Sequence, residues 1–213
     1  MNQAVFLIFQ LSVLLFSVMI HEVSHGLMAL RLGDPTAKNA GRLTLNPMKH
    51  LDPFGSIILP IMLFVLSSGT FVLGWAKPVP YNPLFLKNPK RGAGLIAAVG
   101  PISNVIVAIV FGLLLRLIVP FAEIPIITNL VILLNIVVFI NVLLAIFNMV
   151  PLPPLDGSGI LFSLLPNRFV EIQRFLNRYG FWILILFLFF GFQFLFPIIG
   201  GIYKLIAGPG ALF

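Results

Sequence analysis

The sequence predicts an all-α polytopic membrane protein, with four to six transmembrane or re-entrant helices and short membrane-associated β segments. Two observations predict this fold class. Of the 213 residues, 60% are hydrophobic and only 9% are charged, whereas a soluble domain carries about 25% charged residues. Apolar stretches of transmembrane length also recur along the chain, separated by short polar segments. The composition therefore excludes an ordinary soluble domain.

The first apolar stretch, residues 4–32, predicts one long helix. No charged side chain precedes Glu22, and Gly33 and Pro35 end the helical pattern. A helix of roughly 28 residues is ~42 Å long, which exceeds the ~30 Å hydrocarbon core of a bilayer. We therefore expect this helix to cross the membrane.

Two polar segments, residues 33–53 and 75–92, flank an apolar stretch at residues 54–74. Within the polar segments we expect short extended stretches at residues 41–46 and 77–81. The first of them begins with GRLTL, which alternates polar and apolar side chains as a strand does. An unwound peptide could pair with the edge of such a stretch.

The second half of the chain carries three more apolar stretches of transmembrane length, at residues 94–119, 126–149 and 181–206. A proline-rich turn at 151–154 leads into a short helix that ends near residue 165. Residues 166–178 are basic and amphipathic, which is typical of a helix on the membrane surface. No repeat divides the chain, so we expect one membrane-embedded domain over residues 1–213 with a catalytic core at about 4–165.

The net charge of +7 comes from 13 basic and 6 acidic residues, and in a membrane protein this is a topology signal and not a sign of nucleic-acid binding. The basic residues cluster in 33–53, 75–92 and 166–178, which places these segments in the cytoplasm. The link at 121–125 carries one acid and no base, which suits the outer face. Residues 54–74 would then be re-entrant, with an ordinary crossing as the alternative.

The segment His21-Glu22-Val23-Ser24-His25 is an HExxH motif within the first helix. Two histidines at i and i+4 share one helix face and can bind one Zn²⁺ as neutral imidazoles. Glu22 lies beside them and can take a proton from the attacking water and pass it to the leaving amine. Ionisable groups within a span are costly and mark functional sites. The alternative is a polar patch satisfied by hydrogen bonds between helices.

A catalytic zinc site needs three protein ligands and one open position, so a third ligand must come from another segment. The chain contains no cysteine, which excludes thiolate ligands. Glu123 belongs to the opposite face, Glu171 lies among arginines, and Asp34 lies in a Gly-Asp-Pro turn. The remaining candidates are Asp156, Asp52 and His50. For Asp156 the alternative role is an N-cap of the short helix.

Three motifs occur in order along the chain: HEVSH at 21–25, GPISN at 100–104 and NMVPLPPLDG at 148–157. Together they resemble the site-2 protease family of intramembrane zinc metalloproteases. The GDPTA, GRLTLNP and GWAKPVPYNP segments, and the absence of PDZ domains, resemble a compact prokaryotic branch of that family. The resemblance implies that His21, His25 and Asp156 bind one zinc ion and that Glu22 is the catalytic base.

Three further polar residues are secondary candidates. Asn104 and Asn148 carry amides that could orient substrate or stabilise an oxyanion, with interhelical hydrogen bonds as the alternative. Asn135 and Asn141 fit that packing role better. His50 could be an accessory zinc ligand or a substrate contact, and its alternative is a solvated loop histidine.

The sequence thus predicts an intramembrane zinc metalloendopeptidase of the cell membrane, with its active site nearer the cytoplasmic side. Its partners would be the lipid bilayer and a peptide or membrane-protein substrate, with no nucleic acid; the oligomeric state stays open. The alternatives are a metal-ion transporter and a catalytically inactive membrane scaffold. A transporter needs ionisable groups at several depths, whereas this chain has them at one, and the intact Glu22 argues against a scaffold.

Overall fold

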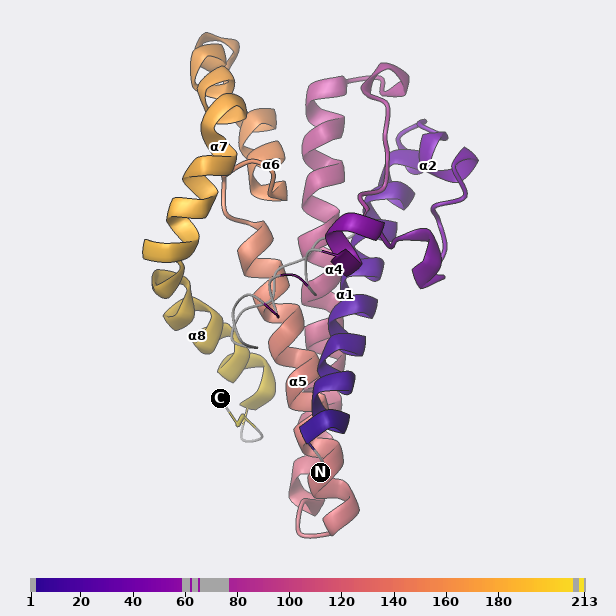
Figure 1. Cartoon of the computed structure of the whole chain (residues 1–213), viewed down its shortest axis with the longest axis vertical. Coiled ribbons are helices and arrows are strands. Elements are labelled where there is room, and N and C mark those ends of the chain that lie inside the picture. Colours follow the sequence, from indigo (N-terminus) through magenta and orange to yellow (C-terminus); the bar gives the residue numbers. More distant parts are fainter. Residues whose placement is uncertain (1–2, 59–61, 63–64, 66–76, 209–210, 213) are drawn as a thin grey trace.

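Figure 1 shows an elongated helical bundle, described by a computed structural model over residues 3–58, 62, 65, 77–208 and 211–212. Its helices are α1 (Gln3–Arg31), α2 (Thr36–Asn39), α4 (Pro89–Ile118), α5 (Pro125–Asn148), α6 (Asp156–Leu164), α7 (Val170–Phe190) and α8 (Phe196–Ala207). Short 3₁₀ turns lie at Pro47–Lys49, Pro83–Phe85, Val119–Phe121, Asn167–Phe169 and Phe192–Leu195, and a π-helical turn lies at Pro53–Ile58. Helix α4 is central, because it packs against α1, α5, α6 and α8.

Three helices among the described residues are long and apolar enough to cross a membrane, namely Val5–Arg31, Pro89–Phe121 and Pro125–Asn148. They confirm the spans expected at 4–32, 94–119 and 126–149. Asn88 begins α4 by accepting a hydrogen bond from the backbone N–H of Arg91 at 3.1 Å, and Pro89 occupies the first turn, where its missing N–H costs nothing.

The span expected at 181–206 is broken in the structure. Helix α7 ends at Phe190, and the chain bends by 70° before it continues through the 3₁₀ turn into α8. Gly191 lies at the break, and Pro197 lies in the first turn of α8. Proline is tolerated in the first turn of a helix but would disrupt a helix that continued through it. The amphipathic segment expected at 166–178 becomes the first half of α7 and continues without a break into the apolar half.

The β segments expected at 41–46 and 77–81 are not found among the described residues. Pro78 and Pro80 have no backbone N–H, so the second stretch can pair along only one of its edges. Its Lys77 N–H instead donates to the carbonyl of His50 at 2.8 Å. The expected re-entrant course of 54–74 lies, beyond Ile58, almost entirely outside the described residues.

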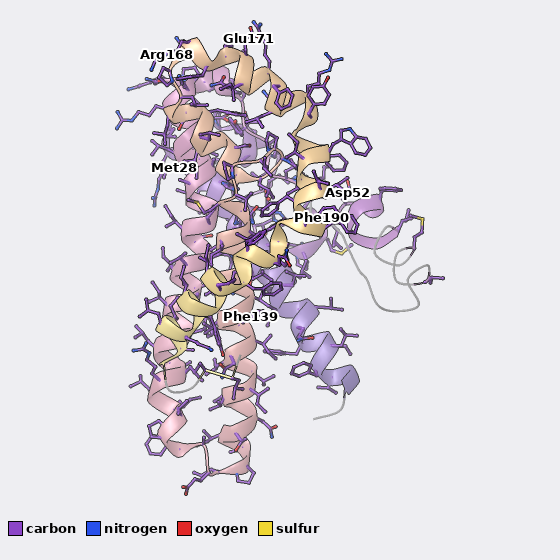
Figure 2. All side chains as sticks on the ribbon, turned by 90° about the vertical axis from the view of Figure 1, so that its left-hand side faces the viewer. Met28, Asp52, Phe139, Arg168, Glu171 and Phe190 are labelled. Atoms are coloured by element: carbon purple, nitrogen blue, oxygen red, sulfur yellow. The ribbon has the colours of Figure 1, made fainter. Side chains whose placement is uncertain are left out.

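The basic segments gather at one end of the molecule. Figure 1 shows α2 and the starts of α4 and α7 at its upper end, whereas the link at 121–125 forms the opposite end. Arg168 and Glu171 extend from the same upper end in Figure 2. Glu171 pairs with Arg174 at 2.6 Å on the exposed surface, as expected for an acid among arginines. The charge distribution along the sequence thus corresponds to two distinct ends of the bundle.

A buried apolar cluster joins α4, α5 and α8. Tyr203 of α8 donates a hydrogen bond to the Asn135 amide oxygen of α5, which confirms a packing role for Asn135. Arg116 of α4 donates to the carbonyls of Leu205 and Ile206 near the end of α8. The arginine therefore caps the last turn of α8, a contact that complements the negative end of the helix dipole.

Candidate metal centre

The two histidines of the HExxH motif pack directly against the backbone of α4. His21 is 6% exposed, and His25 is partly buried beside it with the ring centroids 4.6 Å apart. A Cβ placed on Gly100 would lie 2.4 Å from His25 Cε1 and 2.6 Å from His21 Cε1. Only glycine leaves room for both rings at this position, because those distances are far below van der Waals contact.

Both histidine rings are oriented by oxygen acceptors on α4. His21 Nδ1 lies 2.7 Å from Oδ1 of Asn104, and His25 Nδ1 lies 2.6 Å from the backbone carbonyl of Ile96. A carbonyl oxygen can only accept, so each Nδ1 must carry the proton. Each Nε2 then presents a lone pair, which is the form that a metal ligand requires.

The orientation of the Asn104 amide follows from the groups around it. Its NH₂ group faces the carbonyl of Ser17 at 3.3 Å and Oδ1 of Asn141 at 3.0 Å. The NH₂ group of Asn141 donates to Ser17 Oγ and to the carbonyl of Val137, each at 2.9 Å. Backbone carbonyls cannot donate, so they fix both amides and leave the Asn104 oxygen for His21.

Asp156 reaches this pair of nitrogens from the start of α6. Its Oδ2 lies 2.9 Å from His21 Nε2 and 3.3 Å from His25 Nε2. The close approach depends on Gly157, where a Cβ would lie 2.3 Å from the carbonyl of Met149. Leu155 occupies the N-cap position of α6, so the N-cap role considered for Asp156 is wrong.

The three converging atoms fit a zinc ion. Oδ2 of Asp156 is buried and has no hydrogen-bond donor, since the two nitrogens that it faces carry lone pairs. Three electron-pair donors at such distances repel one another unless a cation lies between them. Ligands of a tetrahedral zinc lie about 2.0–2.2 Å from the metal and therefore roughly 3.3–3.5 Å from each other. The His25 distance falls at the edge of that range, and the His21 distance is slightly shorter.

Glu22 lies beside this cluster. One potential metal-binding atom of each of His21, Glu22 and His25 lies within 4.8 Å of the other two. Glu22 Oε2 accepts a hydrogen bond from the backbone N–H of Val79 at 2.8 Å, which fixes the carboxylate. A carboxylate held next to the metal position is suited to proton transfer.

The stretches 41–46 and 77–81 lie beside the motif although they form no strands. A Cβ on Gly26 would lie 2.6 Å from Leu43 and 2.8 Å from Val79, so both stretches contact α1 one residue after His25. Both stretches therefore lie near the HExxH motif.

Asp34 has the turn role that the sequence indicated. It is fully buried and accepts hydrogen bonds from Thr36 and from the backbone N–H of Asn82, the latter at 2.6 Å. Burial by itself would raise the pKa of this carboxyl, but the hydrogen bonds from Thr36 and Asn82 outweigh it and hold the pKa below its usual value. Through the hydrogen bond from Asn82, Asp34 holds the segment that follows Val79 close to the end of α1.

The structure does not bring the other ligand candidates to this cluster. Asp52 Oδ1 accepts a hydrogen bond from the Gly55 N–H at 2.6 Å, at the start of the π-helical turn. His50 is fully buried, so a solvated loop histidine is the wrong description. Its Nε2 lies 2.7 Å from the Thr44 carbonyl. The group of close potential ligands found among the described residues comprises His21, Glu22 and His25 and contains neither of them, whereas Asp156 is linked to it by its contacts with both histidines.

Asn104 and Asn148 occupy different surroundings. Asn104 is fully buried and engages its whole amide with His21, Ser17 and Asn141. These contacts are the interhelical hydrogen bonds considered as the alternative role of Asn104, and one of them orients His21. Asn148 is half-buried and donates to the Leu144 carbonyl of its own helix at 2.9 Å.

Sequence reasoning missed Ser17 and Val79, and it assigned Asn141 only a packing role. Ser17 lies one helical turn before His21 in an apolar span, and that spacing was the available signal. Val79 acts through its backbone, which leaves no trace in the side-chain pattern.

Comparisons with known proteins identify relatives of this chain. A family model described as Peptidase family M50 matches residues 119–187. A Bacillus subtilis protein named "Putative zinc metalloprotease YwhC" is 37% identical over 171 residues, which covers 79% of this chain and 74% of that protein.

Two mycobacterial proteins named "Putative zinc metalloprotease Rip2" are more distant. The one from Mycolicibacterium smegmatis is 28% identical over 82% of this chain, and the one from Mycobacterium tuberculosis is 30% identical over 75%. The chain spans 64% and 57% of their lengths, respectively. No solved structure matches the chain significantly.

Proposed function

The chain belongs to peptidase family M50, the site-2 protease family of intramembrane zinc metalloproteases, and on this premise we propose that His21, His25 and Asp156 hold its catalytic zinc. One observation carries the assignment: the buried Oδ2 of Asp156 faces both Nε2 atoms with no hydrogen-bond donor between them. Three ligands leave a fourth position for water and substrate.

The residues around the metal position divide the chemistry between them. When bound, zinc supplies a Lewis acid that polarises the scissile carbonyl and lowers the pKa of water. Glu22 accepts the proton of the attacking water and delivers it to the leaving amine. Asn104 keeps His21 in the tautomer that leaves Nε2 bare. Asn148, at the end of α5, remains a candidate for contact with the substrate.

We place the active site nearer the cytoplasmic face of one domain that covers residues 1–213. Arg31 ends α1 six residues after His25, or ~9 Å along the helix at 1.5 Å per residue. Since basic residues favour the cytoplasmic side, that end of the bundle is the cytoplasmic one. The substrate is then a segment of a membrane protein, in or near its span, that unwinds before cleavage.

The test compares the wild-type protein with Glu22→Gln and Asp156→Asn, purified in detergent. Zinc content is measured by elemental analysis, and cleavage is measured on a transmembrane test peptide. We expect Glu22→Gln to retain zinc and to lose at least 100-fold in cleavage rate, since general base catalysis contributes about 10²–10⁴-fold. Asp156→Asn should lose both zinc and cleavage.

Glu123→Gln is the matched control, because Glu123 is exposed in the link at the opposite end. It should match the wild type in both measurements. Cleavage by Glu22→Gln at the wild-type rate would refute the role of Glu22. Zinc flux into liposomes that persists in Glu22→Gln, without any cleavage by the wild type, would favour the metal transporter.

A further inference from the structure

A basic pocket lies where α1 ends and α4 begins, apart from the proposed zinc ligands and base. It is a cavity of about 410 Å³, and its walls include Arg31, Lys87, Arg91, Leu32, Leu86 and Leu95. Arg31 belongs to the last turn of α1 and Arg91 to the first turn of α4. Both helices are candidate spans, so the pocket lies at the depth where a span meets the head groups of the bilayer.

The charge of the basic pocket is uncompensated. Arg31, Lys87 and Arg91 are exposed, and no acidic residue lines the cavity. Among the described residues, none of the three forms a salt bridge with an acidic side chain. Asp34 follows closely in sequence, but Thr36 and Asn82 occupy its carboxylate. Three cations around one cavity attract an anion.

The rest of the basic pocket is apolar, and a second cavity adjoins it. Leu32, Leu86 and Leu95 form its apolar walls. A second cavity, of about 170 Å³, shares Arg31 and is also lined by Ser24, Leu27, Met28 and Val99, so it is partly polar. Three cations beside leucine walls, in one pocket between two candidate spans, match a molecule with an anionic head and a hydrocarbon tail.

We propose that the basic pocket binds the phosphate head group of an anionic phospholipid, with the upper part of an acyl chain against Leu32, Leu86 and Leu95. The two guanidinium groups offer planar pairs of donors that match phosphate oxygens, and Lys87 adds a point charge. The leucine walls favour a lipid over a free phosphate or an acidic peptide, which have no hydrocarbon to place there. Bound lipid would tie together the ends of α1 and α4, the helices that carry His25 and its acceptor Ile96.

The experiment measures lipid retention by the full chain, purified in detergent and observed by native mass spectrometry. Phosphatidylglycerol is the anionic probe and phosphatidylcholine is the zwitterionic one. We expect the wild type to retain one phosphatidylglycerol in preference to phosphatidylcholine. The triple variant Arg31→Gln, Lys87→Gln, Arg91→Gln should lose affinity on the order of 100-fold, because each cation near an anionic membrane surface contributes about fivefold.

A matched control removes the same charge elsewhere. The variant Lys38→Gln, Lys49→Gln, Arg178→Gln lowers the net charge equally with exposed residues that do not line the pocket, and it should retain the lipid. Leu95→Trp fills the cavity without changing the charge and should weaken binding. Equal losses in the two triple variants would refute the pocket and leave only a general effect of charge.

Two competition arms separate the possible sources of the anion. Millimolar inorganic phosphate and a soluble glutamate-rich peptide are each added to the protein that holds phosphatidylglycerol. The proposal expects neither to displace the lipid, because neither replaces the contact of the acyl chain with the leucine walls of the pocket. Complete displacement by phosphate would identify a free-anion site, displacement by the peptide would identify an acidic segment of a protein partner, and either result would overturn the proposal.

Discussion

Replacing Asn104 by leucine should weaken zinc binding without unfolding the protein. The Asn104 oxygen, 2.7 Å from His21 Nδ1, is the group that keeps the proton on that nitrogen. Without it the buried ring can move its proton to Nε2, which removes the lone pair that faces the metal position. Leaving a buried donor without a partner costs about 1–3 kcal/mol.

The same range follows from metal sites in general. Loss of a group that orients a ligating histidine typically costs 10–100-fold in metal affinity, which corresponds to about 1.4–2.7 kcal/mol. We therefore expect the zinc dissociation constant of Asn104→Leu to rise 10- to 100-fold, measured by competition with a chelator in detergent. Asn104→Asp keeps an oxygen acceptor and should bind zinc within a few-fold of the wild type.

Asn135→Leu is the matched control for this experiment. Asn135 is equally buried, but its amide bonds Tyr203 and the Val131 carbonyl in the apolar cluster, away from the histidines. It should lower thermal stability and leave zinc affinity unchanged. The reasoning is refuted if Asn104→Leu binds zinc as tightly as the wild type, or if Asn135→Leu weakens zinc binding as much as Asn104→Leu does.

Three further predictions address the ligand, the close packing and the turn. Chelation of zinc should lower the midpoint of thermal unfolding of the wild type, and added zinc should restore it, whereas Asp156→Asn should respond little to either; an equal response would remove Asp156 from the ligand set. Gly100→Ala should abolish both zinc retention and cleavage, because its Cβ would clash with both histidine rings, while Gly200→Ala, whose Cβ has open space, should leave both intact. The pKa of Asp34 is lowered in the folded state, so its contribution to stability is present above its unfolded value of about 3.9 and is lost as the pH falls through the lower folded value. Thermal unfolding between pH 6 and pH 3 should show that loss in the wild type and in Glu123→Gln but not in Asp34→Asn, and parallel curves for all three proteins would contradict it.

The long helices could be predicted from the sequence because their cause is local. Apolar residues of transmembrane length and the stop at Gly33 and Pro35 depend only on neighbours along the chain. The 70° break at Gly191 was not predicted, because a stretch of the right length and polarity fits a straight span equally well. The β prediction failed because alternation along the chain suggests a strand, whereas a strand also needs a partner to pair with, and none lies beside these stretches among the described residues.

In the candidate site, too, the features with a local cause could be predicted and the others could not. HExxH places His21 and His25 on one face by helix geometry alone, so two ligand positions and the neighbouring Glu22 were predictable. The sequence left Asp156, Asp52 and His50 open as third ligands, and only the resemblance to a family favoured Asp156. The sequence could not predict which group the Asn104 side chain contacts, because an amide within a span is equally compatible with a substrate contact and with a hydrogen bond between helices.

The sequence by itself determined a membrane protein with a metal-binding motif in its first span. Its scarcity of charge and its residue spacing are properties of the chain that need no folding to be recognised. The tertiary structure decided that Asp156 faces both histidines and that Asn104 fixes the proton of His21. It also gathered Arg31, Lys87 and Arg91 around one cavity. The physical reason is that these contacts join segments far apart in sequence, and only the packing of α1, α4 and α6 sets the distances between them.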